Sequence, residues 1–269
     1  MQAFLHNHIM RLFLLPQTFH GQSTIEISGK DFNYLTHALR LKVGQEIMGR
    51  DRNGTLWDLT IASIGRTTCI LTATPATQAI ERTDALPESQ NLKPIILYQC
   101  LPKGRKADDI IKKGTEAGVR DIVLVRSKNC ITDLNGKELQ RLSRYDQIVA
   151  EAIQQSGSLV PTKVDGIIDL KDIPSDFEKR SQGTSRLGLV LHQSSIEGQN
   201  KDLLQCALGF EGTVALVVGP EGGLDDSECQ FLISAGFKAI LLKTNILRCE
   251  TASIYAIGAL QTILQTTCQ

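Results

Sequence analysis

From residue 94 to the C-terminus the sequence alternates strand-like and helix-like segments, and this alternation constrains the fold more than any other feature. Short apolar runs predict the strands, and apolar residues at helical spacing predict the helices between them. We expect strands at 94–101, 121–125, 186–192, 213–219 and 238–242, and helices at 105–117, 139–155, 225–235 and 250–266. Such alternation is typical of a parallel sheet with helices on both faces, which is an α/β fold.

The N-terminal third of the chain is instead rich in short β-patterned segments. Strands are predicted at 11–15, 23–27, 44–48, 55–64 and 67–73, with one helix at about 31–41. Asn53 and Gly54 form a dipeptide that favours a tight hairpin turn. The pattern predicts a small β-barrel with one helix, a shape found in RNA-binding modules and equally in many structural domains.

Local composition indicates where the chain divides. The periodicity is lost after Pro75, in a polar stretch that also holds Pro87 and precedes Pro94. We therefore expect an N-terminal tail at 1–9, a β-barrel domain at 10–75, a linker at 76–93 and an α/β domain at 94–269.

The last predicted helix, 250–266, is apolar nearly all round. Its apolar residues include Ile254, Ile257, Leu260 and Ile263, and small residues lie between them. Such a helix is either buried within its own domain or packed against a second copy. We expect it to be partly buried in a homodimer.

Two loops near the C-terminus share an unusual composition. Residues 219–224 are Gly-Pro-Glu-Gly-Gly-Leu after an apolar run, and residues 246–253 are Ile-Leu-Arg-Cys-Glu-Thr-Ala-Ser after another. Glycines let the main chain approach a ligand, and open α/β sheets bind ligands at the carboxyl ends of their strands. We expect the loops to follow neighbouring strands and to form a ligand site beside Glu221, Arg248 and Glu250. An Arg–Glu ion pair that fixes a turn is the alternative interpretation of these residues.

Other classes of site lack their sequence signatures. The chain has no G-x-S-x-G, Walker A or H-E-x-x-H motif, and no G-x-G-x-x-G follows a predicted strand. The seven cysteines are scattered singly without a C-x-x-C pair, which predicts reduced thiols and no metal site. No apolar run approaches the roughly 18 residues of a membrane span, and no secretion signal is present, so we expect a cytoplasmic protein without a membrane partner.

Charge gives only local guidance about partners. The formal net charge is zero, although residues 93–144 carry twelve Lys and Arg against six Asp and Glu. This basic segment fits either an anionic partner or a solvated helix face. At the end of the first predicted helix, His37, Arg40 and Lys42 lie close together, either as cations that favour a helix C-terminus or as a patch that contacts phosphate.

Six short motifs, taken in order, resemble the family of 16S ribosomal RNA uracil-N3 methyltransferases in the knotted SPOUT superfamily. They are His-Ala-Leu-Arg-Leu-Lys-Val-Gly at 37–44, Leu-Pro-Lys-Gly at 101–104, Lys-Gly-Thr-Glu-Ala-Gly-Val at 113–119, Glu-Ala-Ile-Gln-Gln-Ser-Gly at 151–157, Gly-Pro-Glu-Gly-Gly-Leu at 219–224 and Ile-Leu-Arg-Cys-Glu-Thr-Ala at 246–252. They cover the chain from about Met10 to its end. The last two are the most specific, because both must occur in this order and spacing.

The resemblance implies a PUA-like β-barrel domain followed by an α/β domain with a trefoil knot, S-adenosylmethionine as the methyl donor, and a homodimer that acts on 16S rRNA. The donor-binding residues it implies are Leu191, His192, Gly219, Pro220, Glu221, Gly222, Gly223, Leu242, Ile246, Leu247, Thr251 and Ala252. The RNA contacts it suggests are Arg11, His37, Arg40, Lys42, Lys103, Arg105 and Lys106. Arg248 is expected to stabilise the uracil anion, and Glu250 either positions Arg248 or accepts the N3 proton.

The chain departs from the family pattern at several positions. Ser158 follows Gly157 where the family often has Arg, Lys243 and Asn245 stand where Gly and Arg are favoured, and Tyr34 occupies a position that is often His. These changes bear on RNA contact and on the shape of the donor loop. Two alternatives therefore stay open: a non-catalytic RNA-binding protein on a degenerate methyltransferase fold, and a related methyltransferase with another RNA target.

Overall fold

The computed structural model describes residues 12–51, 53–76, 92–130, 138–192 and 200–266. The predicted tail at 1–9, Arg11 and most of the predicted linker at 76–93 lie outside these residues. The chain forms two compact units, one of Met1–Pro87 with Ile153–Gly157 and one of Glu88–Ala152 with Ser158–Gln269. They are called below the N-terminal unit and the C-terminal unit.

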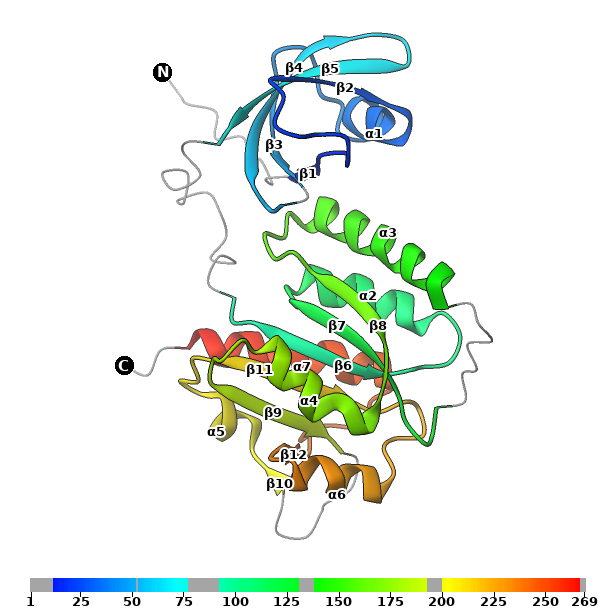
Figure 1. Cartoon of the computed structure of the whole chain (residues 1–269), viewed down its shortest axis with the longest axis vertical. Coiled ribbons are helices and arrows are strands. Elements are labelled where there is room, and N and C mark those ends of the chain that lie inside the picture. Colours follow the sequence, from blue (N-terminus) through cyan, green and yellow to red (C-terminus); the bar gives the residue numbers. More distant parts are fainter. Residues whose placement is uncertain (1–11, 52, 77–91, 131–137, 193–199, 267–269) are drawn as a thin grey trace. The chain divides into compact units, whose positions relative to one another are not determined.

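The N-terminal unit contains a five-stranded mixed sheet (Figure 1). Its strands are β1 (Leu12–Leu14), β2 (Thr24–Ser28), β3 (Glu46–Arg50), β4 (Leu56–Ile64) and β5 (Thr68–Pro75). The order is β1-β3-β4-β5-β2, with β1 parallel to β3 and the other pairs antiparallel. One face covers a core that includes Phe13, Leu35 and Leu59. Because β1 and β2 are its edges, the sheet of the described residues is an open half-barrel. The β-rich composition and the helical segment predicted for a small β-barrel are confirmed, whereas the described strands do not close into a full barrel.

The helical segment of this unit differs from the prediction at its C-terminal end. Helix α1 (Gly29–Asn33) continues into η1 (Tyr34–Ala38), which is π-helical. The N–H of Leu39 donates to the carbonyl of Tyr34, five residues earlier, at 2.9 Å. The chain then leaves the helix, and Arg40 has a φ of 56°. The single helix predicted at 31–41 is wrong beyond Ala38, because apolar spacing does not distinguish a widened helical turn from an α-helical one.

The C-terminal unit contains a seven-stranded sheet in which every pair of neighbouring strands is parallel. Its strands are β6 (Ile95–Cys100), β7 (Asp121–Arg126), β8 (Lys163–Asp169), β9 (Arg186–Leu191), β10 (Asn200–Lys201), β11 (Thr213–Val218) and β12 (Lys238–Ile240). They are ordered β10-β12-β9-β11-β6-β7-β8. Every residue of β6 and β11 is buried, as expected for central strands covered on both faces.

Helices cover both faces of this sheet, as predicted (Figure 1). They are α2 (Lys106–Glu116), α3 (Glu138–Ser156), α4 (Ile173–Arg180), α5 (Leu203–Ala207), α6 (Asp226–Ser234) and α7 (Cys249–Gln265), with a short 3-10 turn η4 (Leu170–Asp172). On β7, Ile122 lies 3.3 Å from where a Cβ on Gly114 of α2 would be. The next residue, Val123, belongs instead to a core cluster with Phe177 of α4 and Leu232 of α6. Successive residues of a strand point to opposite faces, so α2 lies on one face and α4 and α6 on the other.

The strand order corrects one prediction about the two motif loops. The loops follow β11 and β12, but β9 lies between these strands. The expectation that they follow neighbouring strands is therefore wrong. A parallel crossover can place a strand beside any earlier one, and the order along the chain does not say which.

The segment between α3 and β9 holds elements that the sequence pattern does not reveal. Strand β8 is an edge strand with mostly half-exposed residues, so it lacks a continuous apolar run. Helix α4 is short and has a proline in its first turn. A polar network holds it, since Asp176 accepts from Tyr98 Oη at 2.9 Å and from Arg180 Nε at 2.6 Å.

Candidate functional site

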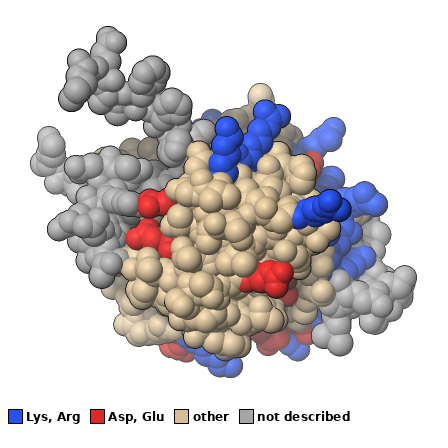
Figure 2. Space-filling view, turned by 90° about the horizontal axis from the view of Figure 1, so that it is seen from above, with Lys and Arg blue, Asp and Glu red and all other residues tan. Residues whose placement is uncertain are grey.

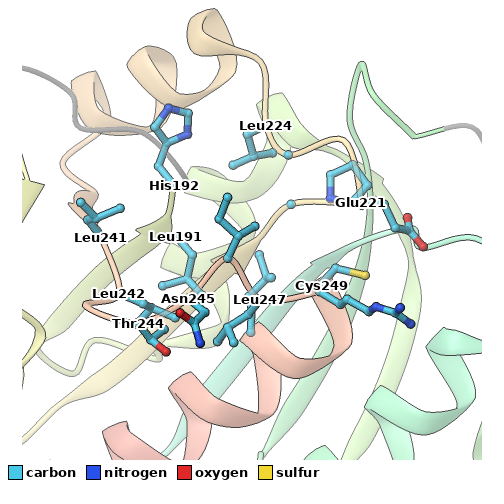
Figure 3. Close-up of a pocket in the computed structure, with 17 residues that line it drawn as sticks. Leu191, His192, Glu221, Leu224, Leu241, Leu242, Thr244, Asn245, Leu247 and Cys249 are labelled. Carbon is cyan, nitrogen blue, oxygen red and sulfur yellow. The ribbon is translucent and has the colours of Figure 1, made fainter.

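A cavity of about 310 Å³ opens at the carboxyl ends of β9, β11 and β12. Its volume is at the lower end of the range for pockets that hold small ligands. Figure 3 shows that its side chains come from the strand ends and from the two motif loops, with leucines on several sides. The strand between the loops contributes Leu191 and His192, so three segments of the chain meet at this site.

The first motif loop is tightly folded. A Cβ on Gly219 would lie 2.9 Å from the main-chain nitrogen of Leu224 and 3.1 Å from the carbonyl carbon of Gly223. Gly223 itself has a φ of 71°, and its N–H donates to the carbonyl of Pro220 at 2.9 Å. Glycine is required at both positions for these reasons, and the main chain forms part of the cavity wall.

The end of this loop is anchored by the N-terminus of α6. Asp225 accepts a hydrogen bond from Ser227 N at 3.0 Å. A capping box is also present: the Asp225 side chain accepts from the main-chain N–H of Glu228, and Glu228 Oε2 accepts from Asp225 N at 3.1 Å. Hydrogen bonds from Ser227 and then Lys128 lower the pKa of Asp225 to about 2. Asn129 Nδ2 donates to the carbonyl of Gly223 at 3.1 Å. The loop is therefore held in place before any ligand binds.

The second motif loop leads into α7. Arg248 is the N-cap residue of that helix, and its side chain is exposed. Ile246 is 88% exposed although it lines the cavity. Burial raises the pKa of the Cys249 thiol to about 12, so this residue faces the cavity as a neutral thiol.

Charged side chains lie at one end of the cavity. Glu221 points outward from the first loop there (Figure 3), and its Oε1 accepts from the main-chain N–H of Lys103 at 3.0 Å. Glu250 Oε2 accepts a hydrogen bond from Cys249 Sγ at 3.3 Å. Lys106 pairs with both carboxylates. The acidic groups from the two loops are thus close together.

The structure brings most of the predicted donor-site residues together. Of the twelve, Gly222 and Thr251 are not part of the cavity lining, and Arg248 lines it in addition. The predicted residues that line it are Leu191, His192, Gly219, Pro220, Glu221, Gly223, Leu242, Ile246, Leu247 and Ala252. The lining residues that were not predicted as donor-binding or catalytic are Val218, Leu224, Leu241, Thr244, Asn245 and Cys249. The sequence signal for Leu224 and Cys249 was their position inside the two motifs.

His192 lies at the edge of this group. In Figure 3 its ring points away from Leu242 and Leu247. Its Nε2 is 3.5 Å from Asp226 Oδ1 at the start of α6. The side chain therefore faces α6, whereas the main-chain N–H of His192 donates to the carbonyl of Ile240 at 3.1 Å and ties β9 to β12.

The predicted RNA contacts fall in two places, one in each unit. His37, Arg40 and Lys42 are exposed where the helical segment of the N-terminal unit ends. Lys103 and Arg105 are exposed between β6 and α2 of the C-terminal unit. Figure 2 shows a face whose centre is mostly uncharged, with Lys and Arg side chains toward its margins. On that face the positive charge is divided into separate groups.

The described residues carry neither a metal-binding cluster nor a membrane-spanning helix. No group of three or more His, Cys, Asp or Glu side chains within those residues is placed to hold a metal ion. The described cysteines are free thiols. In the same part of the chain, no helix has the length and apolar character needed to cross a membrane.

The fold and the cavity define an α/β protein with a cavity at the carboxyl edge of a parallel sheet, the place where open α/β sheets bind their ligands. The chain belongs to the RNA methyltransferase family: residues 88–261, more than half of it, match the family model of the RNA methyltransferase domain. Residues 27–74 match the model of the RNA methyltransferase PUA domain. These matches confirm the family resemblance of the sequence motifs and the predicted order of a PUA-like domain followed by an α/β methyltransferase domain.

The chain aligns with similar proteins over most of its length. The ribosomal RNA small subunit methyltransferase E of Bacillus subtilis is 26% identical over 254 residues, which are 92% of this chain and 93% of that protein. The protein of the same name from Mycobacterium bovis is 29% identical over 167 residues, and this chain spans 62% of its length. Among solved structures, a ribosomal RNA small subunit methyltransferase E from Neisseria gonorrhoeae bound to S-adenosyl methionine has a TM-score of 0.72 and 26% identity, with 94% of this chain and 97% of that chain covered.

Proposed function

We propose that this chain is an S-adenosylmethionine-dependent methyltransferase that methylates N3 of a uridine in 16S ribosomal RNA. The observation that carries the proposal is the single cavity formed by both motif loops, in a chain that aligns over 92% of its length with a small-subunit rRNA methyltransferase. The similar structure from Neisseria gonorrhoeae is bound to S-adenosyl methionine, which supports this methyl donor for the present chain.

The cavity suits the chemistry of this donor. Leu191, Leu242 and Leu247 offer apolar surface for a flat adenine ring, and the main chain around Gly219 offers hydrogen-bonding groups. When bound, the donor supplies a methyl group on a positively charged sulfur, and the sulfur keeps the bonding electron pair when the uracil nitrogen takes the methyl group. The Glu221 carboxylate at the polar end tolerates that positive charge better than a cation would.

Arg248 and Glu250 are the proposed catalytic residues. Uracil N3 loses its proton with difficulty near neutral pH, so the negative charge that develops on O2 and O4 needs stabilisation. Arg248 lies at the cavity edge, at the start of α7, and supplies that positive charge. Glu250 either positions Arg248 or accepts the N3 proton. The two loops hold the methyl donor in line with N3 of the target uracil, and this orientation contributes to the rate of methyl transfer.

RNA binding, assembly and location belong to the same proposal. His37, Arg40 and Lys42 grip the RNA from the N-terminal unit, and Lys103 and Arg105 from the C-terminal unit; the predicted contact Arg11 lies outside the described residues. The target uridine is unpaired or flipped out before attack. A homodimer is proposed because α7 exposes Tyr255 (51%) beside small residues, a face that a second copy can cover. A ribosomal substrate places the protein in the cytoplasm.

Transfer of labelled methyl groups to small ribosomal subunits that lack the modification tests the proposal. Nucleoside mass analysis should find the label as 3-methyluridine. Donor binding without transfer would instead favour a non-catalytic RNA-binding protein on this fold. Labelled product at another atom or base would favour a related methyltransferase with another target.

A further inference from the structure

Lys106, the first residue of α2, bridges the two motif loops. Its Nζ lies 2.8 Å from Glu221 Oε1 in the first loop and 3.4 Å from Glu250 Oε2 at the start of α7. The three side chains are 31%, 26% and 22% exposed, so the ion pairs are partly shielded from water. A single ammonium group therefore connects both segments that line the cavity.

The first loop is held by a second contact from the same region. Glu221 accepts hydrogen bonds from the main-chain N–H of Lys103, at 3.0 Å to Oε1 and 3.3 Å to Oε2. Both oxygens of Glu221 are thus engaged by the turn between β6 and α2. Any displacement of the Lys106 side chain removes one ion pair from the polar end of the first loop and one from the first turn of α7 at once.

The charge balance of the three groups argues against a phosphate contact. One ammonium group and two carboxylates carry a net charge of minus one. An RNA phosphate approaching Lys106 is repelled by both carboxylates at short range. Lys103 and Arg105 are exposed nearby and serve that purpose better.

The same pairing bears on the role of Glu250. Partial burial acts to raise the pKa of Glu250, but its own main-chain N–H, the Cys249 thiol and Lys106 outweigh burial and hold that pKa below its usual value. For Glu221, burial is likewise outweighed, chiefly by the hydrogen bond from Lys106. A carboxylate stabilised as an anion is a weak proton acceptor for the weakly acidic uracil N3.

We propose that Lys106 is a positioning residue: by pairing with Glu221 and Glu250 it fixes both motif loops around the donor, and it keeps Glu250 as an anchored anion that does not accept the N3 proton. This inference rests on the proposed function. It assigns Lys106 a role within the catalytic site in place of the RNA contact that the sequence suggests. Glu250 then helps to place the adjoining start of α7, including Arg248.

The test compares Lys106→Gln and Lys106→Arg with Lys112→Gln, which removes an equal charge from the exposed face of the same helix. Calorimetry measures donor affinity, methyl transfer to small ribosomal subunits measures turnover, and both are followed against pH. Amide hydrogen exchange of residues 219–224 and 248–252 is measured without donor. Lys106→Arg keeps the positive charge and tests whether a cation at this position restores donor affinity and turnover.

Lys106→Gln is expected to weaken donor binding about tenfold, to lower turnover, and to speed exchange in both loops. The pH dependence of activity should shift in a defined direction. A lowered carboxyl pKa means that the anchored state persists at neutral pH and is lost as pH falls through the folded-state pKa. Without the ammonium group the pKa values of Glu221 and Glu250 rise. As the pH is lowered, the variant should therefore lose activity at a higher pH than the wild type does. Lys106→Arg should restore most of the affinity, and Lys112→Gln should match the wild type.

Two outcomes overturn the inference. If Lys106→Gln equals Lys112→Gln in amide hydrogen exchange, donor affinity and pH profile, Lys106 has no positioning role. A variant that changes only the RNA affinity and its salt dependence makes Lys106 an RNA contact. A wild-type protein that neither binds donor nor transfers methyl groups refutes the proposed function instead, and the exchange of the two loops still decides whether Lys106 holds them.

Discussion

Ser253 on α7 donates a 2.5 Å hydrogen bond to Oε1 of Gln99 at the end of β6. Both residues are fully buried. The Nε2 group of Gln99 lies 3.5 Å from the carbonyl oxygen of Gly219 and donates to the carbonyl of Cys100 at 3.0 Å. One buried amide thus joins the central strand, the start of the first motif loop at Gly219, which lines the cavity, and the second turn of α7.

Gln99→Leu should destabilise the protein by about 1–3 kcal/mol, because buried polar partners are left without hydrogen bonds. It should also weaken donor binding, since both loops lose a common support. Thermal unfolding and calorimetry measure the two effects. Ser253→Ala leaves Gln99 Oε1 unpaired. The double variant should therefore lower the free energy of unfolding by less than the sum of the two single variants. Strict additivity would contradict the coupling.

Gly219→Ala should weaken donor binding by at least about tenfold while the protein stays folded. The added Cβ meets main-chain atoms of Gly223 and Leu224, at 3.1 and 2.9 Å, and main chain cannot yield as a side chain can. Gly166→Ala is the matched control, because nothing lies within 4 Å of its Cβ position on β8. Equal donor affinity in the two variants would show that the first loop is not part of the donor site.

Arg248→Ala should lower methyl transfer by about a hundredfold or more and leave donor affinity within a few-fold. The side chain is exposed at the start of α7 and is proposed to act on the uracil anion, not on the donor. Single-turnover transfer and calorimetry separate the two quantities. Arg186→Ala serves as control, because Arg186 begins β9, at the opposite end of that strand from the cavity. Turnover close to normal in Arg248→Ala would remove its catalytic role.

Much of the α/β domain could be predicted from the sequence because its central strands are buried on both faces. Strands β6 and β11 appear as continuous apolar runs, and the predicted ranges enclose the observed ones. The edge strand β8 and the short helix α4 carry no such signal, because their stability comes from contacts such as Tyr98 with Asp176. The trefoil knot implied by the resemblance stays a prediction.

The candidate site was predictable mainly where its residues lie inside the two motifs; outside them, the family resemblance implied only Leu191, His192 and Leu242 of the cavity lining. Leu241 and Thr244 carry no distinctive pattern and join the cavity because of the strand order. Gln99 is an isolated polar residue in an apolar strand, a signal that becomes meaningful once Ser253 is known to face it. The carboxylate partners of Lys106 lie far along the chain, so its sequence context suggested an RNA contact alone.

Arg40→Gln with Lys42→Gln should weaken RNA binding and flatten its dependence on salt. Each phosphate contact releases counterions, so losing two on single-stranded RNA should reduce the slope of log affinity against log salt by about 1.4. The pair Lys30→Gln with Arg66→Gln removes the same charge from other exposed positions of the N-terminal unit. A slope that is the same in both double variants would exclude the patch as an RNA contact.

Among the cysteines that the structure describes, Cys130 should be the first to be alkylated at pH 7. Hydrogen bonding with Cys100, aided by Ser127, lowers the pKa of Cys130 to about 6, whereas burial raises that of Cys249 to about 12. Thiolate is the reactive form, so iodoacetamide labelling at Cys130 should be fast above pH 6 and slow below it, and Cys249 should stay unlabelled. Peptide mass mapping at several pH values measures both.

Labelling at Cys130 should also weaken donor binding. The preceding residue, Asn129, donates through its side chain to the carbonyl of Gly223 in the first motif loop, and an added group displaces this contact. In Cys130→Ser, the same treatment should leave donor affinity unchanged, because the reactive thiolate is absent. Equal labelling rates at Cys130 and the half-exposed Cys206 would contradict the lowered pKa. Unchanged donor affinity after complete labelling would show that the turn before Cys130 does not support the first motif loop.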